Sequence, residues 1–142
     1  AERFLKVMYG DKPKRWSEQL SGFDRYRMVI NCLTRMRYVS PDIELDFVEK
    51  NHPEECQNLT LIPWFEIENR ENREYRIIFG HWSHLKFYSK NNITCLDGGC
   101  VFGGELISID IDRPTKPITV GASTNYCPIS KLEQEYVGDT GN

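Results

Sequence analysis

The sequence has no long apolar run and no strong excess of charge of either sign, and each absence excludes a class of protein. No segment approaches the roughly 18 consecutive apolar residues of a membrane-spanning helix, and the first residues lack the apolar stretch of a secretion signal. We therefore expect a cytoplasmic protein with no membrane partner. The 18 Lys and Arg residues nearly balance the 21 Asp and Glu residues, which argues against nucleic-acid binding driven by bulk charge.

The cysteines are few, odd in number and irregularly spaced, and no Cys-x-x-Cys pair occurs. This excludes a zinc ribbon and a thioredoxin-type redox motif, and it favours reduced thiols. A nucleophilic role is not expected, because Cys100 has no evident base partner. The five cysteines are Cys32, Cys56, Cys95, Cys100 and Cys127.

The 142 residues, of which 39% are apolar, are enough for one domain or part of one. We expect a single, partial domain over residues 1–142, with a poorly patterned tail over residues 114–142. The chain begins with Ala1 and not Met, which suggests that other residues preceded it.

The best helical pattern covers residues 23–39. Tyr26, Val29 or Ile30, and Leu33 recur at intervals of three and four residues, which is the period of one helix face. Basic residues follow the same period on another face: Arg25, Arg27 and Arg35, with Arg37 at the last turn.

Short strands are predicted after this helix. Alternating or continuous apolar residues mark them, and glycines, prolines or polar residues separate them. A helix followed by several strands predicts a mixed α/β (α+β) layer architecture, and an unpaired sheet edge would favour a homodimer of the chain. The predicted strands cover residues 43–48, 75–82, 93–97, 105–112 and 118–120.

His81 is the most specific candidate for chemistry. It follows Gly80 at the end of a predicted buried strand, the place where α/β sheets bind ligands, and imidazole binds divalent metals well. The alternative is a hydrogen-bonded histidine with a structural role. Asp97 ends the next strand and begins a run with four glycines, so it is either a group that orients a metal-bound histidine or a turn carboxylate.

The arginines of the helix are the second candidate. Guanidinium groups bind phosphate oxygens in a bidentate manner, so several on one helix could hold a polyphosphate. The alternative is a solvated face with pairing along the helix.

Three segments in order resemble one family. They are Met8-Tyr9-Gly10-Asp11 with Trp16-Ser17, then Thr34-Arg35-Met36-Arg37, then Phe79-Gly80-His81-Trp82 with the glycine-rich run of residues 96–104. Together they resemble the C-terminal half of the bacterial symmetrical bis(5′-nucleosyl)-tetraphosphatases, the diadenosine tetraphosphate hydrolases of the calcineurin-like metallophosphoesterase superfamily.

The resemblance implies half of a metallophosphatase-type two-sheet β-sandwich flanked by helices. It implies metal-dependent hydrolysis of dinucleoside polyphosphates to two nucleoside diphosphates with two divalent ions, such as manganese, cobalt or magnesium. It also implies that His81 is a metal ligand and that Asp97 orients this histidine. Contacts to substrate are implied for Arg35 and Arg37, and also for Arg25, Tyr9 and Trp16.

The chain departs from the family in one respect. Of the superfamily's metal-binding signatures only a late Gly-His is present, as Gly80-His81. The catalytic residues and remaining ligands are expected in a missing N-terminal half, so no catalytic residue is assigned here and little activity is expected of this chain alone. The alternatives are a non-catalytic, self-associating module and a related phosphatase acting on phosphoproteins.

Overall fold

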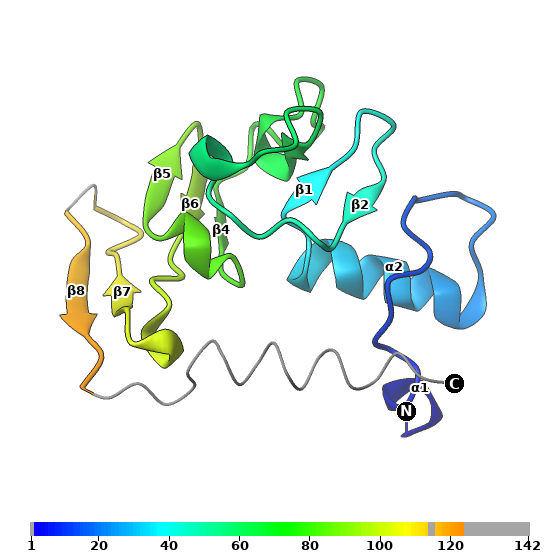
Figure 1. Cartoon of the computed structure of the whole chain (residues 1–142), viewed down its shortest axis with the longest axis horizontal. Helices are drawn as coiled ribbons and strands as arrows, with labels where there is room; N and C mark the ends of the chain where they lie inside the picture. The colour runs from blue at the N-terminus through cyan, green and yellow to red at the C-terminus, as the bar shows by residue number, and fades with distance from the viewer. Residues whose placement is uncertain (1, 114–115, 124–142) are drawn as a thin grey trace. The chain divides into compact units, whose positions relative to one another are not determined.

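The computed structural model describes residues 2–113 and 116–123, in two compact units, Ala1–Tyr75 and Arg76–Asn142. Helices and small sheets alternate along the chain (Figure 1). This mixture confirms the predicted α/β class. The sandwich arrangement and the single domain stay predictions, and residues 114–115 and 124–142 of the predicted tail lie outside the described part, as does Cys127.

The first unit contains one long helix and a three-stranded sheet. The strands run antiparallel in the order β2-β1-β3, with Val39 of β1 opposite Leu45 of β2 and Ile62 of β3. Its elements are α1 (Glu2–Leu5), α2 (Gly22–Thr34), β1 (Tyr38–Val39), β2 (Leu45–Asp46), η1 (Pro53–Glu55), β3 (Ile62–Pro63) and η2 (Trp64–Glu66).

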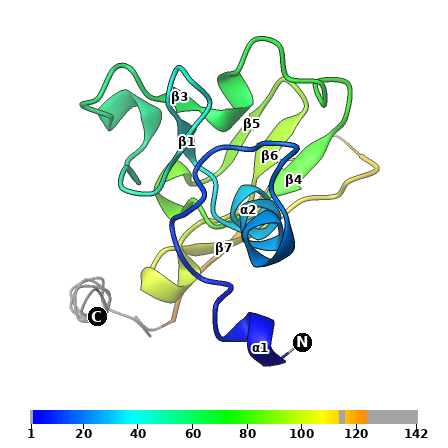
Figure 2. The same cartoon turned by 90° about the vertical axis from the view of Figure 1, so that its right-hand side faces the viewer.

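The core of this unit lies between α2 and the sheet, which are neighbours in both views (Figures 1 and 2). Met28 of α2 packs against Val39 and Leu45, and partly buried apolar side chains surround these three. Trp64 and Phe65 are also buried and meet edge to face, with ring centroids 5.7 Å apart. These two aromatic residues thus add to the buried interior of the first unit.

The predicted end of the helix at Val39 is wrong, because α2 ends at Thr34. Arg35 already leaves helical geometry, with φ −128° and ψ −14°. Tyr38 and Val39 instead form β1, where both are buried and pair with strands on either side. Burial and sheet pairing outweigh a local pattern that a helix would also satisfy.

The second unit contains a three-stranded sheet and a separate strand pair. In the sheet β4 runs parallel to β6, and β5 runs antiparallel to it (Figure 2). Its elements are β4 (Ile77–Phe79), η3 (Ser83–Leu85), β5 (Tyr88–Lys90), β6 (Ile93–Cys95), η4 (Cys100–Phe102), β7 (Glu105–Ser108) and β8 (Ile118–Gly121), the last two being paired.

The strands predicted over residues 75–82 and 93–97 are confirmed as β4 and β6, with shorter bounds. The prediction that the first of them is buried is wrong. All three residues of the central strand β6 are buried, whereas β4 lies at the edge of its sheet with Ile78 exposed. Within the described residues, every helix is too short or too polar to cross a bilayer.

Candidate functional site

His81 and Asp97 lie at the same edge of the second unit's sheet. Strands β4 and β6 are parallel and in register, with Phe79 opposite Cys95, so the residues that follow both strands leave the sheet together. A backbone hydrogen bond from Leu96 N–H to Phe79 O, 3.0 Å long, continues the pairing. A Cβ on Gly80 would lie 3.9 Å from the Cβ of Asp97. The carboxyl ends of parallel strands are where α/β sheets bind ligands.

The backbone at His81 is unusual. Its φ is +71°, in the left-handed region that side chains rarely adopt, and the residue is exposed. The next residue, Trp82, is only 1% exposed and anchors the segment in the core. Strain of this kind persists only where surrounding packing imposes it, and it is common at functional sites.

Close approach of the backbone explains two glycines of the loop after Asp97. A Cβ on Gly98 would lie 2.3 Å from the carbonyl oxygen of Glu105, and one on Gly104 would lie 2.2 Å from that of Gly98. The Asp97 carboxylate accepts a 3.0 Å hydrogen bond from the N–H of Gly99. The loop thus folds tightly back on itself and holds the Asp97 side chain at the sheet edge.

The donor atoms do not complete a metal site by themselves. In the part of the chain that the structure describes, no group of three His, Cys, Asp or Glu side chains could hold a metal ion. His81 has the chemistry and exposure of one ligand, but two-metal sites need several carboxylate and imidazole donors.

Cys95 lies close to this edge but has no reactive character. Burial raises the pKa of its thiol, and the Asp97 backbone hydrogen bond only partly offsets this. Because the thiolate is the nucleophile, a buried thiol with a raised pKa is inert. Cys95 is therefore a structural residue.

The predicted substrate residues lie in the first unit, and Arg35 is held there by several partners. Its guanidinium donates to the Asn31 side chain at 3.1 Å and to the Gly10 carbonyl at 3.3 Å, and it pairs with Asp11 at 3.0 Å. The same group stacks over Phe47 at 4.5 Å. A phosphate would have to replace Asp11 to be bound by this fork.

Arg25 and Trp16 form a second, more exposed group. The Arg25 guanidinium lies 4.7 Å from the centre of the Trp16 ring, a cation–π geometry. The indole N–H donates to the Glu18 carboxylate at 3.1 Å. The ring is 41% exposed and so keeps apolar surface open to solvent.

The other two predicted residues differ in surroundings. Tyr9 is 74% exposed and directly precedes Gly10, one of the Arg35 acceptors. Arg37 is half-buried, and its backbone carbonyl accepts a 2.9 Å hydrogen bond from the N–H of Trp64. Arg35, at the end of α2, therefore contacts the loop that contains Tyr9. Arg37 instead lies in the connection between α2 and β1.

Arg27 has a structural role that the sequence pattern did not distinguish. Its guanidinium donates twice to the Val7 carbonyl, at 2.6 and 2.9 Å, and once to that of Lys12, at 3.0 Å. It also pairs with Asp24 at 2.9 Å. Spacing alone places Arg27 with the other arginines, and only the path of the N-terminal segment reveals what it holds.

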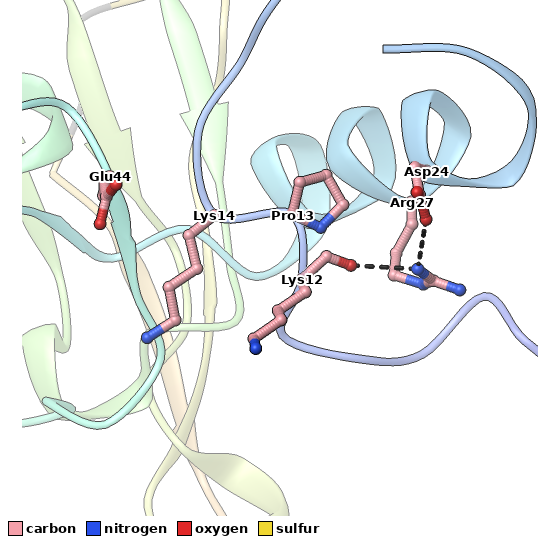
Figure 3. Close-up of a pocket in the computed structure, with 6 residues that line it drawn as sticks. All are labelled: Lys12, Pro13, Lys14, Asp24, Arg27 and Glu44. Atoms are coloured by element: carbon pink, nitrogen blue, oxygen red, sulfur yellow. Dashed lines mark hydrogen bonds and ion pairs between the residues drawn. The ribbon is translucent and has the colours of Figure 1, made fainter.

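A shallow hollow of about 440 Å³ opens beside this arginine (Figure 3). The amines of Lys12 and Lys14 extend along one side of it, while Arg27 is held by Asp24 and the Lys12 carbonyl. The lining mixes both signs of charge and includes Arg27 of the basic helix face, but none of the residues for which the family resemblance implies a role. It consists of Lys12, Pro13, Lys14, Asp24, Arg27 and Glu44.

Comparison with known proteins confirms the resemblance seen in the sequence. A symmetrical bis(5′-nucleosyl)-tetraphosphatase of Methylococcus capsulatus is 45% identical over 109 residues, which are 77% of this chain and 39% of the relative. Proteins of the same name from Paracidovorax citrulli and Aliivibrio fischeri are 42% and 44% identical, over 75% and 76% of this chain and 38% and 40% of their own length.

The aligned part belongs to the C-terminal half of these relatives. The chain spans about two fifths of the length of the relatives that it matches. No family model matches it.

Proposed function

We propose that this chain is the C-terminal part of a symmetrical bis(5′-nucleosyl)-tetraphosphatase, which splits diadenosine tetraphosphate and related dinucleoside polyphosphates. Water would attack a phosphorus of the phosphate chain and break the central anhydride, releasing two nucleoside diphosphates. Identity of 42–45% over three quarters of the chain to proteins of that name carries the proposal.

His81 is the residue we assign to the metal centre. It is exposed, follows a strand at the carboxyl edge of a parallel pair, and has a backbone conformation with a positive φ, which sets the direction in which its side chain leaves the backbone. Its partners would be ligands outside this chain, in the part of the protein that corresponds to the N-terminal half of the relatives. Manganese, cobalt or magnesium would supply charge stabilisation and an activated water when bound.

Asp97 is proposed as the group that supports this edge. Its carboxylate already accepts a hydrogen bond from Gly99 N–H, and it lies beside Gly80. A carboxylate held in this way could accept a hydrogen bond from a metal-bound imidazole or from a water.

Arg35 is proposed as the main phosphate contact. Its fork is already arranged around an anion, the Asp11 carboxylate, and the phenyl ring of Phe47 supports it from one face. A phosphate carries more charge and more acceptor oxygens than a carboxylate, so it competes well for the same guanidinium. Arg37 and Tyr9 would extend this contact, and the Trp16–Arg25 pair would stack against a nucleobase.

Hydrolysis of diadenosine tetraphosphate by the full-length protein tests this function. His81→Asn is the sharpest variant, because Asn tolerates a positive φ better than most residues but lacks the imidazole. We expect kcat/KM to fall by roughly 100-fold or more and bound metal per protein to decrease. His84→Asn is the matched control, since His84 is also exposed and lies three residues further on.

Four outcomes would contradict the proposal. Equal losses in both variants would point to a general effect on the fold, and an unchanged rate in His81→Asn would remove the ligand assignment. Hydrolysis of phosphopeptides in preference to the dinucleotide would favour the related phosphoprotein phosphatase. Robust turnover by this 142-residue chain alone would refute the assignment of the remaining ligands to residues outside it.

A further inference from the structure

Helix α2 turns its apolar stripe outward. The stripe contains five apolar residues at helical spacing, of which the most exposed are Tyr26 at 58% and Leu33 at 80%, while Ile30 is half-buried. We call these residues the outer stripe: Phe23, Tyr26, Val29, Ile30 and Leu33. A surface helix normally turns such a stripe to the core of its own domain.

The opposite face of the helix is polar and is turned inward. Asn31 is fully buried and donates to the Gly10 carbonyl at 2.9 Å, and Arg27 and Arg35 are largely buried as well. Of the apolar residues of α2, only Met28 is fully buried against the sheet. The helix is therefore oriented by its polar contacts to the N-terminal segment, at the expense of the apolar stripe.

Helix α1 borders the outer stripe and does not cover it. The Phe4 ring lies 5.4 Å from that of Phe23 and 5.7 Å from that of Tyr26, measured between centroids. Leu5 is itself exposed. Phe4 thus extends the apolar surface of the outer stripe at the Phe23 end, and exposed apolar patches mark interfaces.

We propose that the outer stripe is the surface on which the N-terminal portion of the same enzyme packs. The inference rests on the proposed function, because the relatives contain that portion and this chain aligns with only 38–40% of their length. An apolar stripe is best covered by an apolar partner surface. Permanent interfaces are more apolar than transient ones, so a permanent partner within the same enzyme fits this stripe. The polar inner face then explains why α2 keeps its orientation before that partner is added.

Cysteine labelling tests the proposal directly. This chain and a fusion that carries the unaligned N-terminal part of the Methylococcus capsulatus relative ahead of it would each receive Leu33→Cys or, as the matched control, Leu59→Cys. Both leucines are apolar and exposed, at 80% and 92%, and Leu59 lies in a loop outside the stripe. Labelling by a maleimide is followed for each peptide by mass spectrometry, and native Cys95, which is fully buried, reports folding of both proteins.

The expected result is protection at one position only. In the fusion, labelling of Leu33→Cys should slow at least roughly tenfold while labelling of Leu59→Cys keeps its rate, because a side chain buried at an interface reacts only through rare openings. Leu33→Lys should lower the melting temperature of the fusion but leave that of the isolated chain nearly unchanged.

Equal labelling rates at position 33 in the two proteins, with Cys95 protected in both, would overturn the proposal. So would protection of position 33 in the isolated chain that grows with protein concentration, because a second copy would then cover the stripe. Protection in a fusion that hydrolyses no dinucleotide would leave the interface standing and refute the proposed function.

Discussion

Replacing Arg27 should detach the N-terminal segment from α2. Three hydrogen bonds join the guanidinium to the carbonyls of Val7 and Lys12, and an ion pair joins it to Asp24. Hydrogen bonds from a charged donor contribute about 1.5–3 kcal/mol each, whereas an exposed pair along a helix contributes about 0.3–0.5 kcal/mol. The carbonyl contacts should therefore dominate.

A pair of variants separates the contribution of the carbonyl hydrogen bonds from that of the Asp24 ion pair. The freed carbonyls can reach water, since Val7 and Lys12 are both exposed, so the loss stays near the lower end of the range. We expect Arg27→Ala to lower the free energy of unfolding by about 2 kcal/mol, and Asp24→Ala by about 0.5 kcal/mol or less. Arg27→Lys should resemble Arg27→Ala, because one ammonium group cannot reproduce the fork.

Urea unfolding followed by tryptophan fluorescence measures these differences, and amide exchange locates them. In Arg27→Ala the amides of residues 7–12 should exchange faster, while those of β6 keep their protection. Equal destabilisation by Asp24→Ala and Arg27→Ala would refute the reasoning, since the ion pair and not the carbonyl contacts would then hold the segment.

Three further predictions follow from other parts of the structure. Gly104→Ala should destabilise the second unit by about 1–3 kcal/mol or more in urea unfolding, because its Cβ would overlap a backbone oxygen, whereas Gly121→Ala meets no atom within 4 Å and should change little. Burial raises the pKa of the Tyr38 hydroxyl from its usual 10.0, so the native protein should lose stability as pH rises above about 10, where the unfolded chain ionises first; Tyr38→Phe should reduce this alkaline loss in urea unfolding, and the buried thiols of Cys32 and Cys95, whose pKa values are also raised, should account for part of the remainder. In the full-length enzyme Asp11→Asn should lower KM for diadenosine tetraphosphate by weakening the internal competitor for Arg35, and an unchanged or raised KM would contradict the exchange of anions proposed there.

Several features of the molecule followed from the sequence without coordinates. The long helix, the strands β2, β4, β6, β7 and β8, and the family resemblance all depend on local patterns and motifs, which neighbouring residues determine. The strands β1, β3 and β5 were not predicted. The glycine-rich run after Asp97 is also evident in the sequence, and the structure shows close backbone approach at Gly98 and Gly104.

The direction of each helix face and the partners of each charged side chain were decided only by the tertiary structure. Periodicity separates the apolar stripe of α2 from its arginines but does not say which face turns inward, and here contacts to the N-terminal segment bury the polar one. In the same way, spacing could not distinguish Arg27, which holds backbone carbonyls, from Arg35, which pairs with a carboxylate at a loop. Such assignments depend on residues about 20 positions away in the chain, and no local pattern contains them.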